Sequence, residues 1–261
     1  MVVPTRTLDV FFPFAKAQGI GYVEIRNDIE INPLALGIAA ADVKIMAENA
    51  NVEILSINAL QRFNEWNDER QTQAIQLIDY AAVCGAKGLV MCPVNDHDYG
   101  KSEDELAANL RQSLTALKPL LKDKGVIGLV EPLGFPQCSL RFKADAVAAI
   151  NDVDGEGVFR LVHDTFHHHL AGESALFPAE TGLMHISGVE DPSLEVADML
   201  DDHRLLVGPK DRLGNIEQIR AMIEKGYRGP VSFEPFATEI HQLADPALAL
   251  KQSIEHIEAS L

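Results

Sequence analysis

The chain has few basic residues for its size. Lysine and arginine together number 22, against 39 aspartates and glutamates, so the formal net charge is −17 at pH 7. A surface this acidic repels the phosphates of nucleic acids and of anionic membranes. We therefore expect neither nucleic acid nor membrane among its partners.

Long apolar stretches and paired cysteines are also missing. No segment reaches the roughly 18 apolar residues that a membrane-spanning helix needs, and Met1–Pro4 does not begin the pattern of a signal peptide. The three cysteines, Cys84, Cys92 and Cys138, are odd in number and lie in apolar or loop surroundings. Reduced thiols are the simplest interpretation, and with the other absences they predict a cytoplasmic protein.

Short apolar runs alternate with helical patterns along the whole chain. Eight runs are predicted as strands: Met1–Pro4, Tyr22–Arg26, Val52–Ala59, Gly88–Cys92, Val126–Glu131, Val158–Asp164, Leu183–Ser187 and Val231–Glu234. Helices are predicted over Leu8–Gln18, Ala39–Ala50, Glu69–Cys84, Glu103–Lys122, Lys143–Asn151, Ile216–Lys225 and Pro246–Leu261. A doubly wound sheet would show the same alternation. The count of eight strands and the lack of a glycine-rich dinucleotide-binding turn favour an α/β fold of the (β/α)₈ TIM barrel type. We expect a single domain over residues 1–261, with a shortened first strand.

Four potential metal ligands fall at the ends of four successive predicted strands. Glu131 and Glu234 each end a strand and precede a proline, Asp164 ends the apolar run that begins at Leu161, and His185 lies near the end of its strand. The carboxyl ends of parallel strands meet at one mouth of a barrel. Three carboxylates and one imidazole suit one divalent ion such as Mn²⁺, Co²⁺, Mg²⁺ or Zn²⁺.

Four segments resemble the xylose isomerase-like barrel superfamily. They are Val130–Gly134, His163–His167, His185–Ser187 and Phe233–Phe236, and the resemblance extends over most of the chain. The superfamily contains sugar isomerases and epimerases as well as endonuclease IV, and the sequence is most similar to its inosose isomerases, with tagatose 3-epimerase and hydroxypyruvate isomerase relatives near by. The resemblance implies that Glu131, Asp164, His185 and Glu234 hold one divalent metal.

The same resemblance implies further residues that contact substrate. His167 matches a histidine that contacts substrate oxygens beside the metal, and Arg204 matches an arginine that reaches substrate before a Pro-Gly turn. Here the order is Gly208–Pro209, with extra residues, which departs from the family pattern. A full barrel would also have a longer first strand, so either the barrel is gapped there or the true start lies upstream.

Two more residues are expected in the pocket from their positions alone. Glu24 is near the end of a predicted strand and is expected to contact substrate, with an ion pair at the rim as the alternative. Trp66 lies in the loop after the strand Val52–Ala59, where it could cover a sugar ring or pack in the core. His163 precedes Asp164, so the alternation of side chains along a strand should point it away from the mouth.

These residues predict a metal-dependent isomerase or epimerase of a keto-sugar or keto-inositol. Both reactions remove a proton from carbon and pass through an enediolate, which a divalent ion clamping the carbonyl and adjacent hydroxyl would stabilise. Glu131 and Glu234, from distant parts of the rim, are the expected acid–base pair. The predicted partner is a small polyol or keto-sugar, and whether the chain forms a homo-oligomer is left open.

Three alternatives belong to other classes. A lyase of the dehydroshikimate dehydratase type would use the same base and metal, and the sequence does not separate it from an isomerase. A nuclease of the endonuclease IV type would need about nine ligands for three metals and a basic groove for DNA, which the net charge opposes. A barrel that binds a ligand without turnover is the third.

Overall fold

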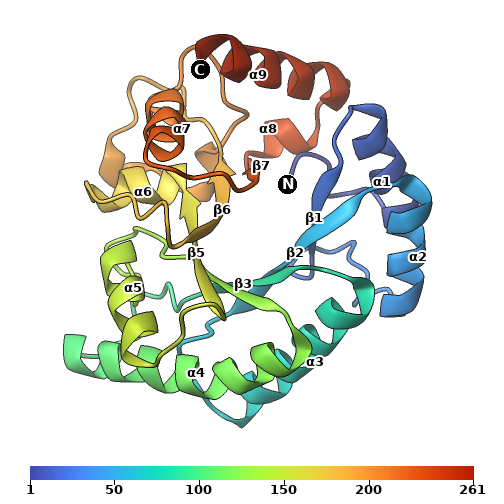
Figure 1. Ribbon diagram of the computed structural model, residues 1–261. Helices are drawn as coiled ribbons and strands as arrows, with labels where there is room; N and C mark the ends of the chain where they lie inside the picture. Colours follow the sequence, from blue (N-terminus) through green and yellow to red (C-terminus); the bar gives the residue numbers. More distant parts are fainter.

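Seven parallel strands form the centre of the molecule, and the helices surround them (Figure 1). The computed structural model describes residues 1–261. The strands are β1 (Tyr22–Arg26), β2 (Glu53–Gln61), β3 (Gly88–Cys92), β4 (Ile127–Val130), β5 (Phe159–Asp164), β6 (Thr181–Ile186) and β7 (Val231–Phe233). Each pairs with the next in chain order, as in a barrel built from repeated strand–helix units. The predicted α/β barrel class is confirmed.

Nine helices surround the strands, and seven of them match the predicted ranges to within two residues. They are α1 (Leu8–Ala17), α2 (Ala40–Ala50), α3 (Asp68–Cys84), α4 (Glu103–Lys124), α5 (Lys143–Asp152), α6 (Thr165–Ala171), α7 (Asn215–Glu224), α8 (Thr238–His241) and α9 (Pro246–Ser260). The short helices α6 and α8 lie outside the predicted set. Gly85 and Gly125 end α3 and α4 in the left-handed conformation that favours glycine, so these two stop signals act as the sequence indicates.

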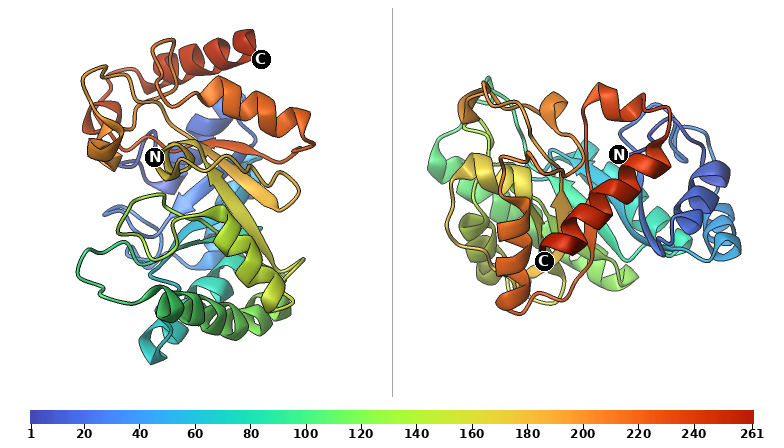
Figure 2. Two further views of the ribbon diagram at one scale, coloured as in Figure 1. Left: turned by 90° about the vertical axis from the view of Figure 1, so that its left-hand side faces the viewer. Right: turned by 90° about the horizontal axis from the view of Figure 1, so that it is seen from above.

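The expectation of an eighth strand at Met1–Pro4 is wrong. The backbone N–H of Arg6 donates to the carbonyl of Val3, which bends these residues into a turn, and Pro4 has no N–H to give to a neighbouring strand. β1 and β7 are therefore the two unpaired edges of the sheet, and no strand lies between them. A cleft of about 380 Å³ lies between the two edge strands, lined mostly by apolar side chains of residues 1–3, α1 and α9. Figure 2 shows α9 passing beside the N-terminus at this opening.

Alternation along the strands divides the barrel interior into an apolar layer and a polar layer. The apolar layer is a buried cluster of Ala59, Val90, Cys92, Leu129, Val162 and Leu183. Val162 and Leu183 lie two residues before Asp164 and His185, so they face the same side of their strands. A larger cluster of 32 buried residues packs the first five strands against α1–α5. The polar ends of the strands thus rest on packed apolar side chains.

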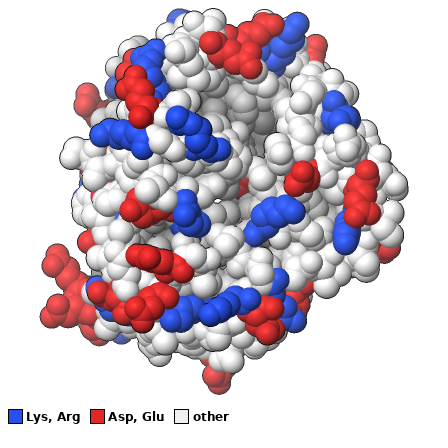
Figure 3. Space-filling model, viewed as in Figure 1, with Lys and Arg blue, Asp and Glu red and all other residues white.

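The surface carries no extended basic patch on the face seen in Figure 3, where basic and acidic side chains lie interspersed. No helix is long and apolar enough to cross a membrane.

Candidate metal centre

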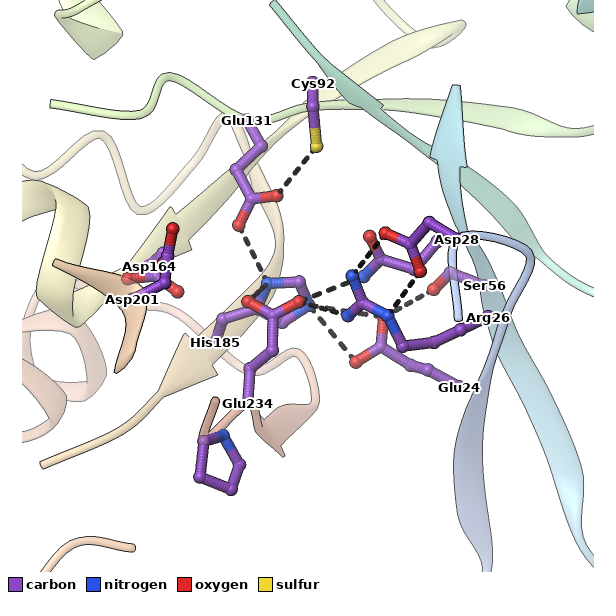
Figure 4. Close-up of polar contacts among 12 residues, drawn as sticks. Glu24, Arg26, Asp28, Ser56, Cys92, Glu131, Asp164, His185, Asp201 and Glu234 are labelled. Atoms are coloured by element: carbon purple, nitrogen blue, oxygen red, sulfur yellow. Dashed lines mark hydrogen bonds and ion pairs between the residues drawn. The ribbon is translucent and has the colours of Figure 1, made fainter. Parts of the chain in front are cut away.

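Four side chains from the ends of four neighbouring strands point to one place inside the barrel (Figure 4). Glu131 directly follows β4, Asp164 ends β5, His185 lies in β6 and Glu234 directly follows β7. One ligand-type atom from each lies within 4.8 Å of those of the other three, and all four residues are buried. The structure therefore brings together the four potential ligands that the sequence places at the ends of predicted strands.

The ring of His185 holds the centre of this group. Its Nδ1 lies 2.8 Å from Oε1 of Glu131 and 3.2 Å from Oε2 of Glu234. Burial lowers the pKa of His185, but the surrounding carboxylates outweigh it and hold that pKa well above its ordinary value. Nδ1 therefore faces a strongly negative site, and a metal cation binding there would take the place of its proton.

The buried charges around the site suit a divalent cation. Four carboxylates are no more than 10% exposed, namely Glu24, Glu131, Asp164 and Glu234, and two guanidinium groups are no more than 11% exposed, those of Arg26 and Arg204. With His185 neutral, as a metal ligand must be, this leaves two negative charges to be balanced in a low-dielectric interior. Three carboxylates and one imidazole can coordinate Mn²⁺, Co²⁺, Mg²⁺ or Zn²⁺, so the donor set fits the metal that the sequence predicts.

Arg204 is fully buried beside two of these carboxylates. Its Nη2 donates to Oδ2 of Asp164 at 2.5 Å and to Oε2 of Glu234 at 3.1 Å. Its Nε donates to Oγ of Ser187, and its guanidinium lies over the rings of Phe166 and Phe236. Burial opposes its charge, but Asp164 and Glu234 raise the pKa of Arg204 above its ordinary value. Arg204, although its turn departs from the family pattern, thus lies at the site.

Glu24 and Arg26 reach the same site from β1, across the open side of the barrel. Nη1 of Arg26 donates to Oε1 of Glu234 at 2.6 Å, and its other nitrogens donate to Asp28. The carboxylate of Glu24 lies 3.1 Å from Nε2 of His185. Burial raises the pKa of Glu24, but His185, Ser232 and Ser56 outweigh it and lower that pKa to about 2.

His167 lies next to the site at the start of α6. Its backbone N–H donates to Oδ1 of Asp164, which caps that helix, and its Nε2 is 3.4 Å from Nη1 of Arg204. Its Nδ1 is buried without a hydrogen-bond partner. A buried imidazole nitrogen left unpaired is costly unless a ligand satisfies it, which agrees with the substrate contact implied for His167.

Trp66 is placed differently from the other expected pocket residues. Its half-buried ring packs against the large core cluster between strands and helices, and no hydrogen bond links it to the four clustered residues. Three inward-facing residues were not predicted: Ser56, whose Oγ donates to Glu24, Asn58, whose Nδ2 is 3.4 Å from Glu234, and Cys92, whose Sγ is 3.6 Å from Glu131. Alternation along their strands could have identified them, since each shares a face with an interior position.

His163 faces away from the centre, as its place before Asp164 predicted. Its Nδ1 is 2.9 Å from Nζ of Lys143, and its Nε2 is 2.9 Å from Oε1 of Gln218. Nζ of Lys143 is also 2.9 Å from Nδ1 of His168. Burial, followed by the charge of Lys143, lowers the pKa of His168 to about 4 and that of His163 well below its ordinary value. These groups form a separate buried polar cluster behind the strand that carries Asp164.

Comparisons with known proteins agree with this geometry. An inosose isomerase of Halalkalibacterium halodurans is 27% identical over 242 residues, which cover 88% of this chain and 83% of that protein. A xylose isomerase domain-containing protein of Salmonella typhimurium LT2 superposes with a TM-score of 0.90 at 29% identity, covering 98% of this chain and 94% of the other. A structure of IOLI protein with a bound zinc atom superposes with a TM-score of 0.87 at 22% identity, covering 98% and 95%, and it supports the fold.

The match also extends to a model of the whole family. The xylose isomerase-like TIM barrel model covers residues 12–260, which include all seven strands and the four clustered ligand residues. The chain belongs to the xylose isomerase-like TIM barrel family.

Proposed function

We propose that the protein is a divalent-metal-dependent isomerase or epimerase of a keto-sugar or keto-inositol. The observation that carries the proposal is the pairing of Glu131 and Glu234 across one buried site, each within 3.2 Å of the same nitrogen of His185. The inosose isomerases among its relatives support a keto-inositol as the substrate class.

Glu131, Asp164, His185 and Glu234 would hold the metal. When bound, the cation supplies a Lewis acid that polarises a carbonyl and stabilises the negative charge that develops when a neighbouring carbon loses its proton. The remaining chemistry belongs to the side chains. One of the two glutamates takes the proton from carbon, and the other or the same one returns it, either to the adjacent carbon in an isomerisation or to the opposite face in an epimerisation.

The neighbours of the two glutamates would place the substrate. His167 has a free, buried Nδ1, and Arg204 carries donors between Asp164 and Glu234. Both can bind hydroxyl or carbonyl oxygens. The apolar layer beneath the site, with Val162 and Leu183, excludes water from below. The carboxylates therefore act in a low-dielectric environment, where their electrostatic interactions are stronger than in water.

A direct test follows the proton. Protein stripped of metal and reloaded separately with Mn²⁺, Co²⁺, Mg²⁺ or Zn²⁺ is incubated in deuterium oxide with keto-inositols and ketoses, and proton NMR follows deuterium entering at carbon. Exchange and a new isomer or epimer with one substrate support the proposal. Loss of water from the substrate would instead identify a lyase, and absence of exchange with every metal-loaded form would refute the proposed reaction.

A further inference from the structure

We propose that Glu24 is a positioning residue that orients His185 toward the metal, which differs from the substrate contact expected of Glu24 from its sequence position. The inference rests on the proposed metal centre and assigns this carboxylate a specific task within it. It is carried by the geometry of one imidazole ring with a carboxylate on each side.

The two nitrogens of His185 face different surroundings. Nδ1 points to Glu131 and Glu234, where a cation would bind, and Nε2 points to the carboxylate of Glu24, with distances of 3.1 and 3.2 Å to its two oxygens. A metal-ligating nitrogen must offer a lone pair, so the neutral ring must carry its hydrogen on Nε2. Glu24 is the acceptor that this hydrogen meets.

Glu24 is itself held in place by neighbouring strands. Oγ of Ser56, on β2, donates to its Oε2 at 2.5 Å. Because Ser56 donates, the carboxylate of Glu24 remains oriented as an acceptor toward His185. A carboxylate that accepts from the outer nitrogen of a ligating histidine fixes the tautomer and ring orientation and makes the ligand more basic.

The contact between Glu24 and His185 also connects two strands across the open side of the barrel. β1 and β7 share no backbone hydrogen bonds, so the barrel is open between them. The pair Glu24–His185 and the pair Arg26–Glu234 cross that opening from β1 to β6 and to the end of β7. The side chains that would bind the metal are therefore joined to the edge strand through these two contacts.

The test measures metal binding in the absence of substrate. Zn²⁺ and Co²⁺ are titrated by calorimetry into demetallated wild-type protein and the variants Glu24→Ala, Glu24→Gln and Glu53→Gln. We expect Glu24→Ala to weaken binding by about 10- to 100-fold, the range for lost partners of a ligating histidine. Glu24→Gln retains an acceptor oxygen and should recover part of the affinity. Glu53, exposed at the start of β2, is the matched charge control and should leave affinity unchanged.

A spectroscopic measurement separates a change in the orientation of the His185 ring from unfolding of the variant. In the Co²⁺ protein, the Nε2–H of a ligating histidine gives a shifted, exchangeable proton resonance. It should be visible in wild-type protein, where Glu24 accepts the hydrogen, and should be broadened or lost in Glu24→Ala. Circular dichroism spectra of the demetallated variants establish that each has folded.

The outcomes distinguish this inference from the proposed reaction. Wild-type metal affinity in Glu24→Ala, together with a raised KM for substrate, would overturn the positioning role and assign Glu24 to substrate binding. A wild-type protein that binds metal tightly but turns over none of the keto-polyols would refute the proposed function while the effect of Glu24 on affinity still stands. A wild-type protein that binds no divalent metal would overturn both.

Discussion

Arg204 donates to Asp164 through a bond of 2.5 Å, and both side chains are buried, at 1% and 0% exposure. A guanidinium so enclosed is stable only because carboxylates surround it, and the carboxylates depend on it in turn. The pair links the loop after β6 to the end of β5, and so joins a residue expected to contact substrate to a residue expected to hold metal.

Replacing Arg204 should therefore destabilise the fold. In the variant Arg204→Met, Asp164 and Glu234 lose their shared donor in the interior, and we expect a loss of about 3–5 kcal/mol in the free energy of unfolding, as for other broken buried ion pairs. Arg204→Lys keeps the charge but not the forked geometry, so its loss should be smaller. Urea unfolding in the presence of a chelator measures both. A methionine variant as stable as wild type would contradict this account.

Removing either acid–base carboxylate should lower turnover strongly without unfolding the protein. Glu131→Gln and Glu234→Gln keep the size of the side chain, but an amide cannot take a proton from carbon. At saturating metal we expect kcat to fall on the order of 10²–10⁴-fold, the usual contribution of general acid–base catalysis. Deuterium exchange at carbon is the measurement. Glu180→Gln, exposed at the opposite end of the barrel beside the start of β6, is the control, and near wild-type exchange by Glu234→Gln would remove that residue from the mechanism.

The sequence predicts the strand ends well, because each is marked by local chemistry. An apolar run that stops at Asp164, or at Glu131 before a proline, identifies both the end of a strand and an inward-facing carboxylate. The alternation that points His163 outward is equally local. The barrel class follows from counting such units, and all of these predictions need only neighbouring residues.

Contacts that cross the barrel could not be predicted in this way. Glu24 and His185 are 161 residues apart and meet because β1 and β6 both direct these side chains into the barrel interior. Trp66 could face the pocket or the core from its sequence position, and only the packed structure shows its ring against the core cluster. Met1–Pro4 is too short for a pattern to separate a strand from a turn, and the hydrogen bond from Arg6 to Val3 made it a turn.

The loop after β4 should be sensitive to one added methyl group. Gly134 has a φ of +72°, and a Cβ there would lie 2.1 Å from the carbonyl oxygen of His167. Gly134→Ala should therefore strain the backbone and push α6, with His167, away from the site. We expect a loss of about 1–3 kcal/mol in stability and a drop in kcat/KM.

A second glycine of similar φ separates the effect of backbone strain from that of the close approach to His167. Gly125 has a similar φ of +67°, but a Cβ there would meet nothing within 4 Å. Gly125→Ala should carry only the backbone cost and leave kcat/KM unchanged. Thermal unfolding and steady-state kinetics on both variants test this, and equal kinetic effects would rule out a role for the close approach to His167.

The buried Lys143 should contribute stability that increases with pH in the alkaline range. Burial lowers its pKa to about 8, although Glu173 opposes the shift, whereas the unfolded chain has the ordinary value of 10.5. Between about pH 8 and 10.5 the unfolded state binds a proton that the folded state has released. Lys143 should therefore add a rise of up to about 1.4 kcal/mol per pH unit to the free energy of unfolding in this window. The buried thiols of Cys84, Cys92 and Cys138, whose pKa values burial raises, contribute a slope of the opposite sign.

Comparison of two lysine variants isolates this contribution. Between pH 8 and 10.5 the slope of the unfolding free energy against pH should be lower in Lys143→Met than in wild type, because the variant has no amine to titrate, even though it also leaves His163 and His168 without their donor. Lys87 is exposed, with 66% of its side chain accessible, so its ammonium is in water whether or not the chain is folded. Lys87→Met should therefore keep the wild-type slope. Urea unfolding across the window gives each slope, and a Lys143→Met slope equal to that of wild type would show that Lys143 keeps its proton in the folded protein.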